Sequence, residues 1–128
     1  MMRMKAGLML VFFLLLTGCG AENMNHNTYE QITQEKAKSM MDTSQVVIMD
    51  VREQHEFDAG HIPGAILLPV GSITAETAAE VIPEKDAIVL VYCRSGNRSK
   101  TASAILCELG YTGIYEFGGI NTWPYGIE

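Results

Sequence analysis

Ile88-Val89-Leu90-Val91-Tyr92-Cys93-Arg94-Ser95-Gly96-Asn97-Arg98-Ser99 contains two contrasting halves. Residues 88–92 are an uninterrupted apolar run rich in β-branched side chains, which is typical of a strand covered on both faces in a parallel sheet. Residues 93–99 are mostly polar, and they precede a helical pattern that begins near Ser99 or Lys100 and stops at Gly110. The order of strand, polar loop and helix predicts one βα unit with Cys93 at the end of its strand.

The same two patterns alternate through the rest of the chain. Shorter apolar runs at 46–49, 66–68 and 114–117 predict further strands. Helical apolar spacing follows Thr33 and Thr74, and threonine is a favourable residue at the start of a helix. This alternation predicts an α/β domain with a central parallel β-sheet flanked by helices. Ligands of such sheets bind beyond the carboxyl ends of the strands, and Cys93 is placed there.

Residues 1–18 predict a signal peptide. Arg3 and Lys5 are followed by an apolar run at 7–16 that is too short to span a bilayer as a helix. Leu16-Thr17-Gly18-Cys19 resembles the lipobox of bacterial lipoproteins, in which the cysteine is acylated and becomes the new N-terminus. We therefore expect a lipidated Cys19, a polar tether at 19–28 and a folded domain at 29–128, anchored to the extracytoplasmic face of the cell membrane. An ordinary secretory signal or an uncleaved anchor is the alternative.

Charge and cysteine content narrow the class of protein further. The 128-residue chain has a formal net charge of −6, and removal of Arg3 and Lys5 would make it more acidic still. Such a domain is a poor candidate for binding nucleic acid. If Cys19 is acylated, Cys93 and Cys107 allow at most one disulfide, so the core must hold the domain together. The three histidines lack the spacing of a zinc site, and we expect neither a metal nor an organic cofactor.

The loop at 93–99 has the composition of an anion cradle. Amide groups of the loop and of the following helix can point inward, and Gly96 permits the positive φ that such a loop needs. Arg94 and Arg98 add fixed positive charge. A thiol in these surroundings should ionise more readily than an ordinary cysteine. We therefore predict that Cys93 is a reactive thiolate and not an inert core residue.

Four segments, in this order, resemble the rhodanese family of sulfurtransferases over nearly all of the mature domain. They are Ile48-Met49-Asp50-Val51-Arg52-Glu53-Gln54-His55-Glu56-Phe57, Gly60-His61-Ile62-Pro63-Gly64-Ala65, Val91-Tyr92-Cys93-Arg94-Ser95-Gly96-Asn97-Arg98-Ser99 and Phe117-Gly118-Gly119-Ile120-Asn121-Thr122-Trp123. The resemblance implies an α/β domain whose cysteine carries a sulfane sulfur as a persulfide, a role that falls on Cys93. The residues that match the family's substrate cradle are Arg94, Ser95, Gly96, Asn97, Arg98 and Ser99.

The resemblance implies a double displacement. Cys93 would take sulfur from thiosulfate or a persulfide donor and pass it to a thiol or cyanide acceptor, which could be part of a protein. Between Cys93 and Arg98 lies one residue fewer than in related cysteine phosphatases, which favours sulfur transfer over a phosphatase or arsenate reductase activity. The alternative from another class is a non-catalytic binding or sulfide-sensing module at the membrane surface.

Other conspicuous residues are expected to support the fold. We expect Asp50, Arg52 and Glu56 to form internal ion pairs and hydrogen bonds that fix the loop after their strand. His61 is expected to shape a tight turn with Pro63. A buried or half-buried position is expected for Cys107, and Trp123 should close the core near the C-terminus.

Overall fold

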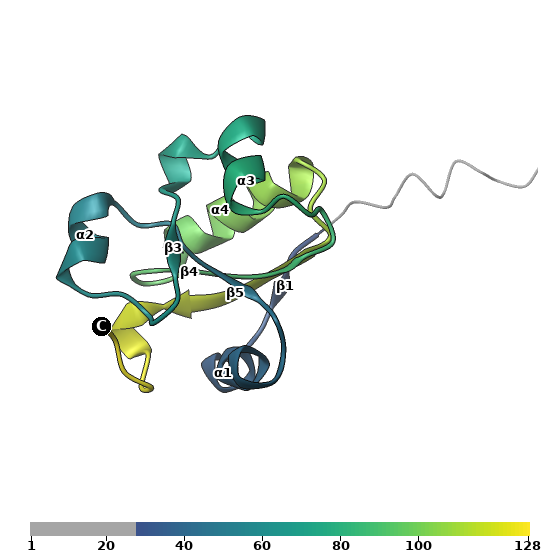
Figure 1. Cartoon of the computed structure of the whole chain (residues 1–128). Coiled ribbons are helices and arrows are strands. Elements are labelled where there is room, and N and C mark those ends of the chain that lie inside the picture. Colours follow the sequence, from purple (N-terminus) through teal and green to yellow (C-terminus); the bar gives the residue numbers. More distant parts are fainter. Residues whose placement is uncertain (1–27) are drawn as a thin grey trace, which may run out of the picture.

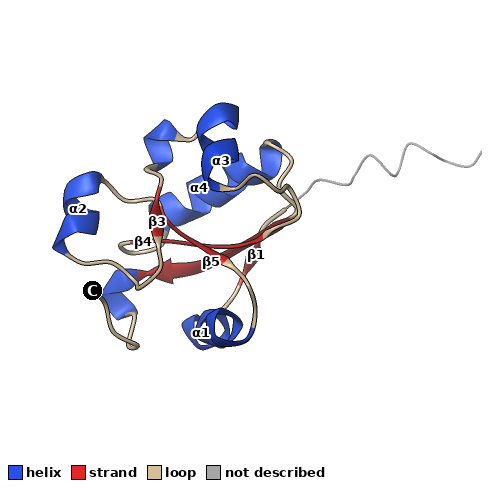
Figure 2. Ribbon diagram, viewed as in Figure 1, coloured by secondary structure: helices blue, strands red, loops and turns tan. Residues whose placement is uncertain are grey.

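In the computed structural model, which describes residues 28–128, five parallel strands form one sheet in the order β1-β5-β4-β2-β3. The strands are β1 (Glu30–Gln31), β2 (Val47–Asp50), β3 (Ile66–Leu67), β4 (Ile88–Cys93) and β5 (Gly113–Gly119). The strand that ends at Cys93 is the central one, so its carboxyl end lies between two neighbours (Figure 2). The predicted α/β fold with a central parallel sheet is confirmed.

Helices cover both faces of this sheet. They are α1 (Gln34–Thr43), α2 (Gln54–Ala59), α3 (Ala75–Val81) and α4 (Asn97–Glu108), with short 3₁₀ turns η2 (Val70–Ser72) and η3 (Ile120–Thr122). Figure 1 shows α3 and α4 on one face, α1 on the other, and α2 at one end of the sheet. The predicted helix starts are confirmed, because the side chains of Thr33 and Thr74 accept hydrogen bonds from the first turns of α1 and α3.

The side chains of β4 alternate between two apolar clusters, as the period of a strand requires. Val89, Val91 and Cys93 belong to the cluster under α3 and α4. Leu90 and Tyr92 belong to the cluster that contains Ala37 of α1. The Cys93 side chain therefore lies on the face of the sheet that α4 covers.

Three local predictions differ from the structure. The two-residue strand β1 is exposed and was not expected, and neither was α2, which buries none of its residues. Helix α4 begins at Asn97, two residues earlier than Ser99, because Gly96 ends the loop with a φ of 107°. This left-handed conformation is easily adopted by glycine and lets the chain turn directly into the helix. Asn97, Arg98 and Ser99 consequently form the first turn of α4.

The predicted signal peptide, Cys19 and almost all of the tether lie outside the described residues. Within 28–128, every helix is too short or too polar to cross a membrane.

Candidate active site

The thiol of Cys93 lies at the junction between β4 and α4. Its side chain is buried, with 1% exposed, and its sulfur accepts a hydrogen bond from the Gly96 amide at 3.0 Å. The sulfur also lies 3.4 Å from Ser99 Oγ. The Gly96 amide therefore points toward this sulfur, as predicted.

Hydrogen bonding decides how Cys93 titrates. Burial alone would raise the pKa of this thiol, but the Ser99 hydroxyl and the amides of Ser99, Gly96 and Ser95 stabilise the thiolate more strongly. The pKa of Cys93 is therefore lowered from its ordinary value. This is the direction expected for a nucleophilic cysteine at a helix N-terminus.

Two glycines at the end of β5 make room for the loop. A Cβ on Gly119 would lie 1.9 Å from the Arg94 carbonyl oxygen, which is far inside van der Waals contact. That carbonyl accepts a hydrogen bond from the Asn121 amide at 3.2 Å. Gly118 has a φ of 93° and lies against Gly96. The Gly-Gly pair thus fixes the path of the loop that surrounds Cys93.

Arg98 is held by a carboxylate from another element. Its two terminal nitrogens donate to the two oxygens of Glu56 on α2, at 2.7 and 2.9 Å. These hydrogen bonds lower the pKa of Glu56 to about 2 and raise the pKa of Arg98. Glu56 also accepts a hydrogen bond from the Glu53 amide at 3.1 Å, as expected of a residue that fixes the loop after β2, but its pairing with Arg98 across the site was not expected. The positive charge of Arg98 is largely balanced, and its guanidinium braces the loop against α2.

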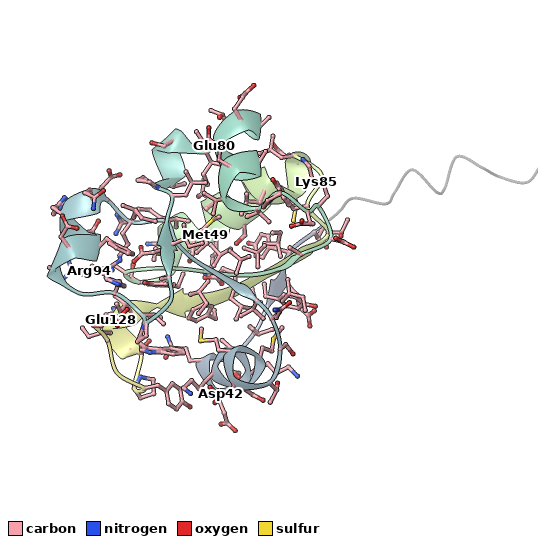
Figure 3. All side chains as sticks on the ribbon, viewed as in Figure 1. Asp42, Met49, Glu80, Lys85, Arg94 and Glu128 are labelled. Carbon is pink, nitrogen blue, oxygen red and sulfur yellow. The ribbon has the colours of Figure 1, made fainter. Side chains whose placement is uncertain are left out.

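Two clefts border the loop. The first, of about 430 Å³, is lined by Arg94, His55, Glu56, Ile120 and Asn121 among others. Arg94 is exposed and lies at the same end of the molecule as α2 and Glu128 (Figure 3). In the described part of the chain no ion pair involves Arg94, so its charge, unlike that of Arg98, is not balanced by a carboxylate.

The second cleft, of about 420 Å³, lies beside Ser95, Gly96 and Lys100 and reaches Glu116. Of the remaining predicted site residues, Ser95 and Asn97 are exposed, whereas Gly96 and Ser99 are buried. The structure therefore brings Cys93, Gly96 and Ser99 together in the interior and leaves Arg94, Ser95 and Asn97 on the surface.

A buried polar network fixes the neighbouring strand β2. Asp50 pairs with Arg52 at 2.7 Å and accepts the Tyr92 hydroxyl at 2.6 Å. The Tyr92 oxygen in turn accepts the Ile62 amide at 3.1 Å, and Arg52 donates to the Gly60 carbonyl. Burial and the hydrogen bond to Asp50 raise the pKa of Tyr92 well above its ordinary range. The supporting role expected of Asp50 and Arg52 agrees with this geometry.

Glu116 is a site residue that the sequence analysis missed. It lies on β5 with only 2% exposed and accepts a hydrogen bond from Ser99 Oγ at 2.5 Å. A signal was present in the sequence, because Glu116 comes two residues after the apolar Ile114 and must share its face of the strand. A carboxylate on the core face of a buried strand is costly and usually has a specific partner.

The remaining predictions concern supporting residues. His61 stacks on Phe57 with ring centroids 3.8 Å apart, and its Nδ1 lies 3.0 Å from the Phe57 carbonyl oxygen, which fits a turn-shaping role. Cys107 is buried in the core cluster, as expected, and burial raises its pKa. Trp123 packs against the cluster around Phe117. Within 28–128 there is no group of three or more His, Cys, Asp or Glu side chains that could hold a metal ion.

A parallel sheet with a buried cysteine in an amide-lined loop defines a class of domain, and sequence comparison identifies it. The chain belongs to the rhodanese family, because the Rhodanese-like domain matches residues 33–124. This confirms the resemblance seen in the four sequence segments.

Individual relatives agree with this assignment. The chain is similar to thiosulfate sulfurtransferase PspE of Escherichia coli, with 38% identity over 73 residues, covering 57% of this chain and 69% of that protein. A sulfurtransferase of Allochromatium vinosum is 39% identical over 88 residues, covering 68% and 79%. A solved rhodanese with anions from E. coli is similar with a TM-score of 0.61 and 32% identity, covering 66% of this chain and 98% of that chain. Several relatives are therefore sulfurtransferases by name, whereas others, such as a protein of Cytophaga hutchinsonii that is 35% identical, are named tRNA uridine(34) hydroxylase.

Proposed function

We propose that this protein is a sulfurtransferase that moves a sulfane sulfur from thiosulfate or a persulfide donor to a thiol or cyanide, with Cys93 as the sulfur carrier. The observation that carries the proposal is the environment of Cys93, whose sulfur is hydrogen-bonded to the Gly96 amide and whose pKa is lowered. Burial alone would have the opposite effect, as it has on Cys107. Membership of the rhodanese family supports the same reaction.

The reaction proceeds by two displacements. The Cys93 thiolate attacks the outer sulfur of thiosulfate, a new S–S bond forms, and sulfite leaves with the electron pair of the old S–S bond. A thiol or cyanide then attacks the outer sulfur of the persulfide, and Cys93 leaves as a thiolate. The amides of Ser95, Gly96 and Ser99 stabilise negative charge on sulfur in both steps. This cycle uses no metal and no organic cofactor.

Arg94 is the residue we assign to attract an anionic donor. It lines the cleft beside the loop and is exposed. Arg98 was also expected to bind the donor, and Glu56 takes two of its five N–H groups and balances its charge. Its proposed role is therefore to hold the first turn of α4 in place, while the amides of Ser95, Gly96 and Ser99 line the sulfur position.

The test is thiocyanate formation from thiosulfate and cyanide by matched cysteine variants. Cys93→Ser should abolish the activity, because the hydroxyl is a poor nucleophile for sulfur and cannot carry a persulfide. Cys107→Ser, the matched control, should retain it because Cys107 lies on the core side of α4. Activity that survives in Cys93→Ser would show that another group carries the sulfur, and an inactive wild-type protein would favour a non-catalytic binding module.

We further propose that the domain works at a membrane surface. The support is the sequence alone: the apolar run at 7–16 and the Leu16-Thr17-Gly18-Cys19 motif predict a lipid on Cys19, with a tether to residue 28 and the domain at 29–128. Two or more acyl chains on one residue would give stable anchoring on the extracytoplasmic face. Cys19→Ser should shift the protein from the membrane fraction to the soluble fraction. Retention of Cys19→Ser in membranes would indicate an uncleaved apolar anchor.

A further inference from the structure

Three buried side chains form a continuous chain of hydrogen bonds that ends at Cys93. Ser99 Oγ lies 3.4 Å from the Cys93 sulfur and donates to Glu116 Oε2 at 2.5 Å. Cys93 is 1% exposed, Ser99 0% and Glu116 2%. Because a serine hydroxyl has one proton, Ser99 accepts from the Cys93 thiol while it donates to the carboxylate. The resting arrangement therefore runs from S–H through O–H to a carboxylate.

The partners of Glu116 do not include a counterion. Its carboxylate accepts hydrogen bonds from Ser99 Oγ, from the Gly118 amide at 2.9 Å and from Gln31 Nε2 at 3.3 Å, all of which are neutral groups. None of the ion pairs within the described residues involves Glu116. Burying a carboxylate without a counterion is costly, which suggests that Glu116 has a role beyond stabilising the fold.

We propose that Glu116 accepts the proton of the Cys93 thiol through Ser99 and thereby generates the nucleophilic thiolate. The thiol proton moves to Ser99 Oγ as the hydroxyl proton of Ser99 moves to Glu116 Oε2. The products are a Cys93 thiolate, a Ser99 hydroxyl that now donates to sulfur, and a neutral Glu116 carboxylic acid. The net charge of the three groups stays at minus one, so the step needs no other reactant.

The cleft beside Glu116 gives the proton a way out of the hydrogen-bonded group of Cys93, Ser99 and Glu116. Glu116 borders the cleft that Gln31, Gln34 and Lys100 also line, whereas Arg94 lines the other cleft. Water in the Glu116 cleft can take up the proton from Glu116 or return it. The charged groups that face this chain are few: Lys100 lies in the same cleft as Glu116, and Arg98 acts electrostatically on Cys93.

This arrangement has a signature in the pH dependence of Cys93. Where the pair of Cys93 and Glu116 shares one proton, the fraction of thiolate depends on the position of that proton and not on the pH. The reactivity of Cys93 should then stay nearly flat over a range in which an isolated thiol gains about tenfold in thiolate for each pH unit. A purely structural role for Glu116 would leave the wild-type profile as steep as that of an isolated thiol.

The experiment measures the rate at which iodoacetamide modifies Cys93 in the full-length protein between about pH 5 and 7, with the site assigned by peptide mass mapping. The wild-type rate should change less than about threefold over this range, because the proton stays within the pair. Glu116→Gln keeps a hydrogen-bonding side chain but cannot take a proton, so its rate should rise about tenfold per pH unit. Ser99→Ala breaks the chain at its middle and should give the same steep profile, and the double variant should resemble either single variant.

Glu30→Gln is the matched control, because it removes an exposed carboxylate from β1 and should leave the profile flat. A wild-type rate that rises about tenfold per pH unit would overturn the proposal without reference to any variant. So would a flat profile in Glu116→Gln or in Ser99→Ala, or an absence of modification at Cys93 at every pH.

This inference rests on the proposed nucleophilic role of Cys93, but its test needs no sulfur donor. A flat wild-type profile in a protein that forms no thiocyanate would uphold the proton path and reject the sulfurtransferase. Thiocyanate formation with a steep wild-type profile would do the reverse.

Discussion

Cys93 and Cys107 belong to the same apolar cluster, yet their thiols are shifted in opposite directions. Burial raises the pKa of Cys107. Burial also acts on Cys93, but the Ser99 hydroxyl and three amides outweigh it and lower the pKa. The two cysteines are 1% and 6% exposed, so exposure does not separate them.

The difference between them is a matter of position in the fold. Cys93 ends a central parallel strand, where the first turn of α4 directs its unpaired amides. Cys107 lies within the last turns of the same helix, where the amides are engaged in the helix itself. A reactive cysteine in this domain is thus made by the strand-to-helix junction and not by the residue type or its burial.

Gly119→Ala is expected to have the largest effect on the difference in pKa between Cys93 and Cys107. The new methyl group would collide with the Arg94 carbonyl, so the loop must move and carry its amides away from Cys93. The pKa of Cys93 should then rise toward that of Cys107, and thiocyanate formation at neutral pH should fall roughly 100-fold or more. Thiol titration and steady-state kinetics measure both effects.

Gly71→Ala is the control for this variant, because no atom beyond its own residue and its two chain neighbours lies within 4 Å of the added methyl group. It should leave both the Cys93 pKa and the activity unchanged. If Gly119→Ala retained a low Cys93 pKa, the loop amides could not be its cause.

A smaller effect is expected from Arg94→Ala. This variant tests whether the attraction of the donor and the ionisation of the Cys93 thiol depend on different groups. Loss of the exposed guanidinium should raise the KM for thiosulfate about tenfold, or about 1.4 kcal/mol, while the Cys93 pKa changes little. Lys38→Ala removes a positive charge on α1 that pairs with Asp42 and is the charge-matched control. An unchanged KM in Arg94→Ala would mean that another group binds the donor.

The smallest effect concerns the brace between α2 and the loop. The pKa of Glu56 is about 2 in the folded protein, below its ordinary value, so the ion pair with Arg98 stabilises the fold above pH 4.5. This contribution should disappear as the pH falls from about 4.5 to 2. Urea unfolding across this range should show a difference between wild type and Glu56→Gln that narrows with acidity. A constant difference would mean that the ion pair does not stabilise the fold.

The sequence was sufficient for the elements with strong local signals. The apolar runs at 46–49 and 88–92, the caps Thr33 and Thr74, and the need for Gly96 in a turned loop each follow from a few adjacent residues. The confirmed parallel sheet follows from their alternation. These features placed Cys93 correctly at the carboxyl end of the central strand.

What the sequence could not supply depends on contacts between distant segments. Helix α2 buries no residue, so no apolar period marks it. The pairing of Glu56 with Arg98 joins residues 42 positions apart, and that of Ser99 with Glu116 joins residues 17 positions apart. Only the packing of α2 and β5 around the loop brings these carboxylates to their partners. The local sequence patterns therefore could not predict the balanced charge of Arg98 or the hydrogen bonds that link Cys93, Ser99 and Glu116.

The most direct test of the central claim is the mass of the intact protein after incubation with thiosulfate. The account predicts one added sulfur atom, mapped to Cys93, that is lost again when cyanide is added. An unmodified Cys93, or a sulfur that maps to Cys107, would contradict it.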